Sequence, residues 1–193
     1  HHVYDLDFGD NLVKNQKFDK AILTPSTKEE YGKHDMPISK KEIINQKLVD
    51  KDIYELAEKY ALQLFAEGEK WAKQQGLILV DTKYEFGLVD GELIVIDEIH
   101  TPDSSRYWIA DEYEARFQNG DDQLMLDKEN IRQWLISKGF SGEGTPPELD
   151  QDIRVLLSEK YIELYKILTG QDFNPSIGDV SNRIQTNLKN AGF

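Results

Sequence analysis

The chain has 193 residues, of which 39% are hydrophobic and 31% charged, and a formal net charge of −13, so we expect one globular core and a surface that repels nucleic acid. It has no cysteine, which excludes disulfides, thiolate zinc sites and cysteine nucleophiles and fits a cytoplasmic protein. The first residues lack a signal-peptide pattern, and no apolar run approaches the roughly 20 residues that span a membrane, so no membrane partner is expected.

Residues 1–38 are rich in turn formers and show neither a helical nor a strand period. A segment of this length without regular structure often carries function, although a plain surface connection explains the same composition. We therefore predict an irregular N-terminal segment over residues 1–38, a main lobe over 39–173 and a polar tail over 174–193.

Helical patterns recur after residue 38. Ser39, followed by Glu42 three positions later, predicts a capping box. Residues 52–75 carry apolar side chains three and four positions apart, and Gly76 ends this helix. Further helices are predicted at residues 127–138, with Asp127 as N-cap, at 147–169, and in shorter form around 111–119 and 179–190.

Two apolar runs, residues 77–88 and 91–99, flank a turn and predict an antiparallel hairpin. The first run places Asp81, Lys83 and Glu85 at alternate positions, so these three charges share one face of the predicted strand. The other face is apolar and is expected to pack against a helix.

The length of the turn decides which later charge joins this face. A two-residue turn places Glu85 opposite Ile96 and sends Asp97 to the other face. A three-residue turn, with Gly91 left-handed in a bulge, places Lys83 opposite Asp97. We predict the bulged turn, because it gathers all four charges on one polar face.

The carboxylates of Glu85 and Asp97, with Lys83 beside them, suit a hard cation such as Mg²⁺. This ion typically takes one or two protein carboxylates and leaves its other positions to water and substrate phosphates. A surface ladder of salt bridges explains the same spacing, and both interpretations stay open at this point.

The loop at residues 101–106 follows the second run, where a rigid scaffold can present binding groups. Arg106 can hold a phosphate or carboxylate through two parallel hydrogen bonds. Arg132 lies near the start of a predicted helix, whose backbone N–H groups attract anions. Each arginine alone fits an ordinary surface position, but the set indicates a nucleotide or phosphate-ester site.

Three segments resemble signature segments of the SAICAR synthetase (phosphoribosylaminoimidazole-succinocarboxamide synthase) family. Residues 77–87 and 96–108 resemble its aspartate-lysine-glutamate strand and its "TPDSSR" loop, and residues 22–39 resemble its "TPTTK…HD" region. The resemblance extends from about residue 15 to residue 170. It implies an α+β (α/β) fold, in which an antiparallel hairpin or sheet packs against several helices.

The resemblance also implies an activity and a set of site residues. Members of this family are ligases of purine biosynthesis that join carboxyaminoimidazole ribonucleotide (CAIR) to L-aspartate with ATP and Mg²⁺, giving SAICAR, ADP and phosphate. The small-molecule partners are thus CAIR, L-aspartate and ATP. By resemblance, Lys83 and Asp81 act at the reacting carboxylate of CAIR, and Arg106, Ser105 and Arg132 hold the nucleotide. The resemblance also implies that Asp35 and His34 approach the substrates and that Lys28 reaches ATP. Glu85 and Asp97 would carry Mg²⁺ with the ATP phosphates.

The resemblance covers only the larger, C-terminal lobe of the family, without the small lobe that bears a glycine-rich phosphate loop. We therefore expect this chain to be inactive as a ligase when assayed alone. Two other interpretations are a non-catalytic binding module that keeps the shape of the lobe, and an unrelated Mg²⁺-dependent phosphotransferase, which would not require the "TPDSSR" loop. The sequence is compatible with a homo-oligomer and does not specify one.

Overall fold

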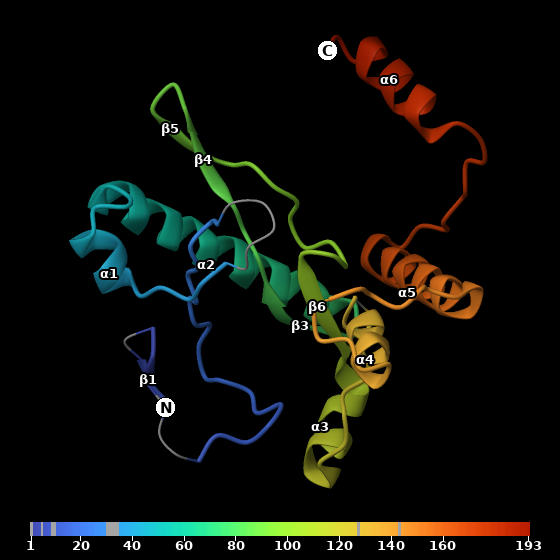
Figure 1. Cartoon of the computed structure of the whole chain (residues 1–193), viewed down its shortest axis with the longest axis horizontal. Helices are drawn as coiled ribbons and strands as arrows, with labels where there is room; N and C mark the ends of the chain where they lie inside the picture. The colour runs from blue at the N-terminus through green and yellow to red at the C-terminus, as the bar shows by residue number, and fades with distance from the viewer. Residues whose placement is uncertain (1, 5, 9–10, 30–34, 127, 143) are drawn as a thin grey trace.

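The computed structural model describes residues 2–4, 6–8, 11–29, 35–126, 128–142 and 144–193. Helices and short antiparallel strands are mixed along the chain, which confirms the predicted α+β class (Figure 1). The elements in chain order are β1 (His2–Val3), β2 (Leu6–Asp7), α1 (Lys40–Asn45), α2 (Lys51–Gln74), β3 (Leu77–Thr82), β4 (Phe86–Val89), β5 (Glu92–Val95), β6 (Ser105–Ile109), α3 (Ala110–Asn119), α4 (Glu129–Ser137), α5 (Gln151–Thr169) and α6 (Val180–Asn190).

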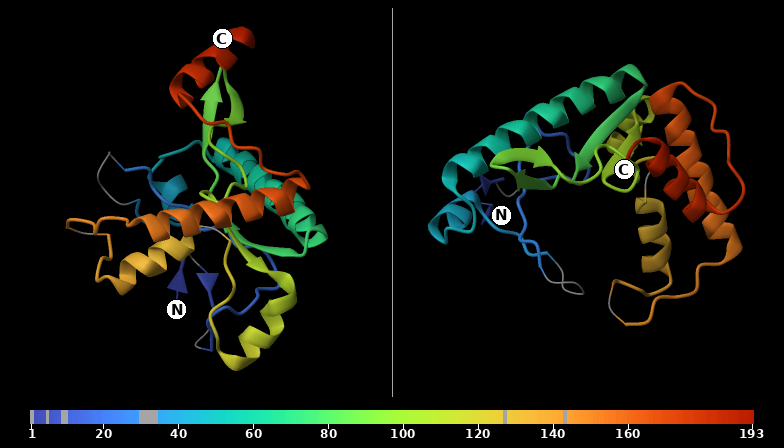
Figure 2. Two further views of the ribbon diagram at one scale, coloured as in Figure 1. Left: turned by 90° about the vertical axis from the view of Figure 1, so that its right-hand side faces the viewer. Right: turned by 90° about the horizontal axis from the view of Figure 1, so that it is seen from above.

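Helix α2 is the longest element and lies alongside β3 (Figure 2). Asp50 caps it by accepting a hydrogen bond from the backbone N–H of Asp52 at 2.9 Å, which satisfies a group that the first helical turn leaves free. Gly76, at φ +75°, adopts the left-handed conformation that follows the helix end. The prediction of a helix over residues 52–75 is confirmed, with a shift of one residue at each end.

The core lies where α2, the β3–β6 pair and α5 meet. Leu77 and Leu79 of β3 and Leu164 of α5 are almost fully buried. Each buried leucine stabilises the fold by roughly 1.5–3 kcal/mol relative to an exposed one. The remaining core members are Ala72, Tyr107 and Leu126, with Phe65, Ile109, Ile167 and Leu168 packed around them.

The first apolar run divides into two strands with different partners. β3 pairs with β6, and only β4 pairs with β5 to form the hairpin. The predicted continuous strand over residues 77–88 is therefore wrong, because its apolar half joins the core sheet and its later half forms a separate ribbon.

The hairpin turn has two residues, so the predicted three-residue bulged turn is wrong. Phe86 pairs with Val95 and Val89 pairs with Glu92, which leaves Asp90 and Gly91 as the turn. Both turn residues have positive φ, +52° and +84°, the geometry of a type I′ turn. This turn matches the right-handed twist of the flanking strands, and Asp-Gly is one of its preferred sequences.

A register shift in β3 occurs instead between Leu79 and Asp81. Strict alternation would direct Asp81 to the side that Leu77 and Leu79 occupy, which is the core. The extra residue in β3 changes this alternation, and the side chain of Asp81 is 58% exposed. The irregularity thus lets a charged residue follow a buried strand directly.

The remaining helices agree with their predicted positions in most respects. The capping box at Ser39 and Glu42 is present in α1, and the tail contains α6. Helix α4 begins at Glu129, and its expected N-cap Asp127 lies outside the described residues. None of the helices in the described ranges is long and apolar enough to span a membrane.

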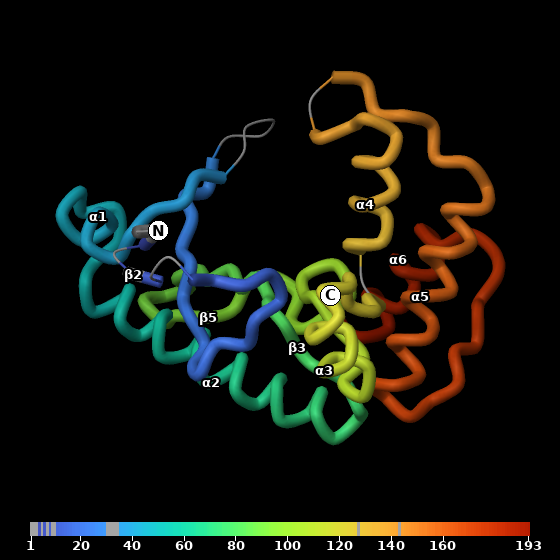
Figure 3. The backbone as a smooth tube through the Cα atoms, turned by 90° about the horizontal axis from the view of Figure 1, so that it is seen from below, coloured from blue at the N-terminus to red at the C-terminus, as the bar shows by residue number. Residues whose placement is uncertain are grey.

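The N-terminal segment crosses the molecule before α1 begins (Figure 3). The hydroxyl of Tyr113 on α3 donates a hydrogen bond to the carbonyl of Asn15 at 2.8 Å. Further along, Ser26 and Pro37 form an isolated antiparallel bridge. This segment therefore runs from α3 to the region where the hairpin starts.

Candidate functional site

Four charged side chains meet where the N-terminal segment reaches the β3–β4 connection. Nζ of Lys83 lies 2.9 Å from Oε1 of Glu85 and 3.4 Å from Oδ2 of Asp35. Lys28 forms an ion pair with the other oxygen of Glu85. We refer to Lys28, Asp35, Lys83 and Glu85 as the charged cluster, and the structure thus brings together four of the residues that the sequence indicated.

Local backbone contacts hold both sides of the charged cluster. On one side, the N–H of Thr27 donates to the carbonyl of Met36 at 2.9 Å, and the N–H of Glu29 donates to the Asp35 carboxylate at 3.1 Å. On the other side, the N–H of Ile96 donates to the carbonyl of Glu85 at 3.0 Å. The cluster is therefore held by two bridged stretches of the N-terminal segment and by the start of the hairpin.

The cluster carries two positive and two negative charges. Hydrogen bonds from Lys28 and Lys83 lower the pKa of Glu85, whose side chain is 18% exposed. The bond to Glu85 raises the pKa of Lys83, and the backbone hydrogen bond from Glu29 lowers the pKa of Asp35. All these shifts favour the ionised forms at neutral pH, and each lysine is paired with a carboxylate.

A second pair of contacts joins β3 to β6 close to the cluster. Nη2 of Arg106 lies 3.2 Å from Oδ2 of Asp81, the residue opposite it in the sheet. The next pair, Thr82 and Ser105, shares a hydrogen bond between hydroxyls at 2.8 Å. Ser105 is 5% exposed, whereas the side chains of Arg106 and Asp81 are 35% and 58% exposed.

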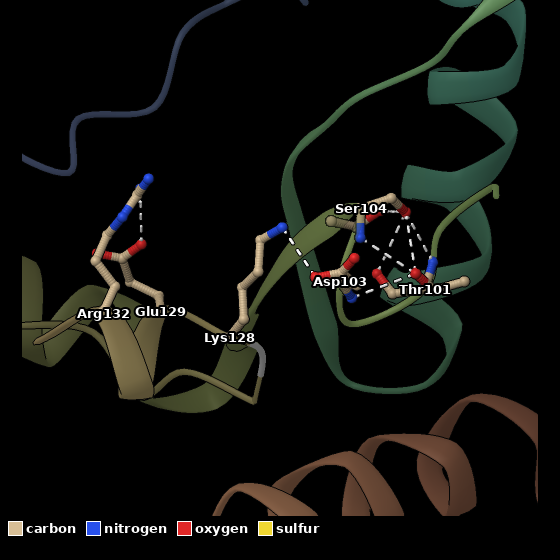
Figure 4. A network of polar contacts seen from close by, with 7 residues as sticks. Thr101, Asp103, Ser104, Lys128, Glu129 and Arg132 are labelled. Atoms are coloured by element: carbon tan, nitrogen blue, oxygen red, sulfur yellow. Dashed lines mark hydrogen bonds and ion pairs between the residues drawn. The ribbon is translucent and has the colours of Figure 1, made fainter. Parts of the chain in front are cut away.

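The loop before β6, Thr101–Ser104, is folded on itself and is referred to here as the polar loop (Figure 4). Oγ1 of Thr101 accepts hydrogen bonds from the N–H groups of Asp103 and Ser104, at 3.3 and 3.1 Å. Lys128 binds Asp103 at 3.0 Å and thereby connects the loop to the start of α4. Lys128 was not predicted as a site residue, and its place beside the expected N-cap of a helix was the only signal for it.

Arg132 lies on α4 and does not join Arg106. Its side chain is 66% exposed, and Nη1 is 3.4 Å from Oε2 of Glu129. In Figure 4, the side chains of Arg132 and Lys128 extend in the same general direction from the start of this helix. The helix therefore presents two cations to one side.

Asp97 is expected on the face that carries Lys83 and Glu85, but it forms no ion pair with the described residues of the cluster. Asp97 is exposed and accepts a hydrogen bond from the N–H of Glu98 at 2.9 Å. The two-residue turn pairs the backbone of Glu85 with Ile96, so the expected pairing of Lys83 with Asp97 is wrong. His34 lies outside the described residues.

The residues present fit Mg²⁺ only with help from a ligand. Within the described ranges, no three His, Cys, Asp or Glu side chains gather in the way that a protein-only metal site requires. Mg²⁺ needs no such group when substrate phosphates complete its coordination, and Glu85 offers a carboxylate for it. Glu98, whose pKa is raised by local desolvation and by the neighbouring Asp103, lies at the polar loop instead.

A hollow of about 500 Å³ lies elsewhere, between the N-terminal segment and α2. Two of its charged groups already pair with each other, since Lys40 binds Glu58 at 2.7 Å and lies over the ring of Tyr54 at 5.5 Å. No predicted site residue lines it, so its size alone does not make it the functional site.

Comparisons with known proteins all identify the same family. The family model described as SAICAR synthetase matches residues 5–147. The phosphoribosylaminoimidazole-succinocarboxamide synthase of Bacteroides thetaiotaomicron is 46% identical over 94% of this chain and 59% of its own length. That of Legionella pneumophila (strain Lens) is 42% identical over 95% of this chain and 60% of its own length. The chain thus spans about 59% of the first of these relatives.

Two solved structures are similar in fold. The SAICAR synthase of Saccharomyces cerevisiae, complexed with SAICAR, matches with a TM-score of 0.71 and 34% sequence identity. The matched region covers 90% of this chain and 54% of the yeast chain. A SAICAR synthetase in complex with ADP has a TM-score of 0.51 and 26% identity over 74% of this chain and 48% of its own.

Proposed function

The chain belongs to the SAICAR synthetase family, and we propose that it binds the imidazole nucleotide and the ATP phosphates during the ATP-dependent ligation of CAIR and L-aspartate to SAICAR. The observation that carries this proposal is the charged cluster, in which Lys28 and Asp35 meet Lys83 and Glu85 from a distant part of the sequence. The relatives' names and the SAICAR and ADP bound in two similar structures support it.

The chemistry explains why such a cluster is useful. In the proposed reaction, the CAIR carboxylate attacks the γ-phosphorus of ATP, the bond to ADP breaks, and an acyl phosphate forms. The amine of L-aspartate then attacks the acyl carbon, phosphate leaves, and the amine loses a proton as the amide forms. Donor and acceptor are both anionic in the first step, so fixed cations at the reacting atoms lower the barrier.

We assign Lys83 and Asp81 to the reacting carboxylate of CAIR, and Lys28 to ATP. Both lysines are ion-paired with Glu85 in the structure, but each ammonium group carries three N–H donors, so each can contact an incoming anion while it stays in place. Asp35 also binds Lys83 and would hold this lysine in position if Glu85 turned to another cation. Asp35 and the neighbouring His34 are proposed to approach the substrates.

Glu85 would hold Mg²⁺ with the ATP phosphates, and Asp97, assigned to the same ion by the family resemblance, lies apart from the cluster in the structure. Bound there, the ion would neutralise phosphate charge during transfer. Glu85 is suited to this role because it is ionised and is held by flexible lysine side chains that can exchange for another cation.

The nucleotide phosphate is assigned to Arg106, Ser105 and Arg132. Arg106 is partly exposed and has Asp81 as its ion-pair partner, which orients the guanidinium before the ligand arrives. The hydroxyl of Ser105 is shared with Thr82, so its contribution depends on the oxygen lone pairs that this bond leaves free. Residues 1–38 would act as the substrate- and ATP-facing segment, 39–173 as the binding lobe and 174–193 as a tail.

The test is a calorimetric titration of this chain with SAICAR and with CAIR, with and without Mg²⁺. We expect binding that is lost in the Arg106→Ala, Arg132→Ala double variant and retained in the control Arg154→Ala, Arg183→Ala. Binding that survives the first double change would place the nucleotide at another site. Because the chain spans about 59% of a relative's length, we expect no ligase turnover by this chain alone.

A further inference from the structure

Tyr84 and His100 join the two segments that carry the proposed site. The hydroxyl of Tyr84 and Nε2 of His100 are hydrogen-bonded at 2.6 Å, and their rings meet edge to face with centroids 5.6 Å apart. Tyr84 stands between Lys83 and Glu85 of the charged cluster. His100 immediately precedes Thr101, the first residue of the polar loop.

The backbone of His100 is held in an unusual conformation. Its φ is +57°, in the left-handed region that a histidine adopts far less readily than glycine. The hydroxyl of Tyr107 in the core donates a hydrogen bond to its carbonyl at 2.8 Å. The core therefore fixes the backbone of the residue that immediately precedes the polar loop.

The ring of His100 rests against α2 at Gly68. A Cβ atom on this glycine would lie 2.4 Å from Cε1 and 2.7 Å from Nε2 of the imidazole, closer than real contacts allow. Gly68 thus leaves the space in which the ring meets Tyr84. Burial also lowers the pKa of His100, which keeps the ring neutral at neutral pH.

The same two segments touch through their backbones. The N–H of Lys83 donates to the carbonyl of Ser104 at 3.0 Å, at the far end of the polar loop from His100. The side chain of Asp103 also ties the loop to Lys128 at the start of α4. The cluster segment and the polar loop are therefore linked at both ends of the loop, once by side chains and once by backbone.

We propose that Tyr84 and His100, seated on Gly68, form a positioning pair that sets the polar loop and the following Ser105 and Arg106 relative to Lys83 and Glu85. Neither residue touches substrate. The consequence for ligand affinity rests on the proposed function, whereas the mechanical link between the segments does not.

Hydrogen exchange of single amides tests the link. Tyr84→Phe removes only the hydroxyl, and His100→Asn withdraws the ring while keeping a residue that tolerates positive φ. We expect the amides of Lys83, Ser104 and Ser105 to exchange about fivefold faster or more in each variant, with the amides of α5 unchanged. The matched control is Tyr113→Phe, which removes a tyrosine hydroxyl bonded to a carbonyl elsewhere.

The double variant Tyr84→Phe, His100→Asn shows whether the two residues stabilise the loop together or independently. If they act together, the amides of Lys83, Ser104 and Ser105 exchange no faster in the double variant than in either single variant. Additive effects would overturn the proposal, as would equal acceleration across the whole chain or no acceleration at all. Gly68→Ala, which pushes on the same ring, is expected to accelerate the same amides.

A calorimetric titration with SAICAR supplies the functional readout. We expect Tyr84→Phe to weaken binding by about threefold to tenfold without lowering the melting temperature by more than the control does. Unchanged affinity despite faster exchange would overturn the positioning role. If the unaltered chain does not bind SAICAR, the proposed function fails, while the exchange experiment still decides whether the pair holds the loop.

Discussion

Asp81 and Arg106 lie opposite each other on β3 and β6, with a guanidinium nitrogen 3.2 Å from a carboxylate oxygen. This pair exists because the register shift after Leu79 turns Asp81 away from the core. One backbone irregularity thus lets Arg106 of β6 pair with a carboxylate at the end of β3. The pair and the charged cluster together form the proposed nucleotide site.

The first prediction concerns Arg106→Ala. The pair is largely exposed, so its loss should change the free energy of unfolding by less than about 1 kcal/mol. SAICAR affinity should fall about tenfold or more, because a charge-assisted hydrogen bond contributes roughly 1.5–3 kcal/mol. Urea unfolding and calorimetry measure the two effects, with Lys160→Ala, which removes another exposed ion pair, as the control. A large loss of stability with unchanged affinity would contradict a binding role.

The second prediction concerns the pH dependence of Glu85. Its pKa is lowered in the folded state, chiefly by the hydrogen bond from Lys28, so the unfolded state binds a proton more readily. The stabilisation is present above the unfolded value near 4.5 and is lost as pH falls through the lower folded value. Unfolding measured from pH 6 to pH 3 should therefore show Glu85→Gln less stable than the unaltered chain at pH 6, with the difference shrinking on acidification. A difference that stays constant with pH would show that the lysine contacts do not stabilise the ionised form.

The third prediction concerns His100, which faces the titratable side chain of Tyr84. Burial lowers its pKa from 6.5, so the unfolded chain is protonated first as pH falls. The free energy of unfolding should decrease below pH 6.5, and His100→Asn should lack this component. Urea unfolding between pH 8 and pH 5 measures this pH-dependent part of the unfolding free energy. The contributions of the other histidines are present in both proteins and cancel when the two profiles are subtracted. Parallel pH profiles for both proteins would contradict the burial of a neutral ring.

The fourth prediction concerns the core. Leu164 on α5 is fully buried among side chains of α2, β3 and β6, so Leu164→Ala should cost about 2–5 kcal/mol of unfolding free energy. Leu156 lies on the same helix but is 42% exposed, and Leu156→Ala should cost much less. Equal losses in urea unfolding would mean that α5 does not pack in the orientation described.

Local sequence patterns predicted the elements that depend on residues close together in the sequence, such as helices and their caps. The helical period located α2 and the C-terminal end of α5, although α5 starts at Gln151 rather than at residue 147, and the pairing of Ser39 with Glu42 located the start of α1. The Asp90–Gly91 turn was recognised, but its length was chosen to gather charges on one face. The preference of Asp-Gly for a type I′ turn was the better guide.

The sheet pairing could not be predicted, because it depends on contacts between distant residues. Nothing within residues 77–88 indicates that β3 pairs with β6 while β4 pairs with β5. All four members of the charged cluster are named as site residues through the family resemblance, but their meeting in one place was not predicted. Lys128 was missed because it lies outside the signature segments, whereas Glu98 lies within residues 96–108 and was passed over in favour of Asp97.

The central claim is that the imidazole nucleotide binds between the charged cluster and the Asp81–Arg106 pair. Its most direct test is an amide NMR titration of this chain with SAICAR. We expect saturable shifts at Lys83, Glu85, Ser105 and Arg106, with no shifts around the hollow at Tyr54. Shifts confined to the hollow, or none at any concentration, would contradict it.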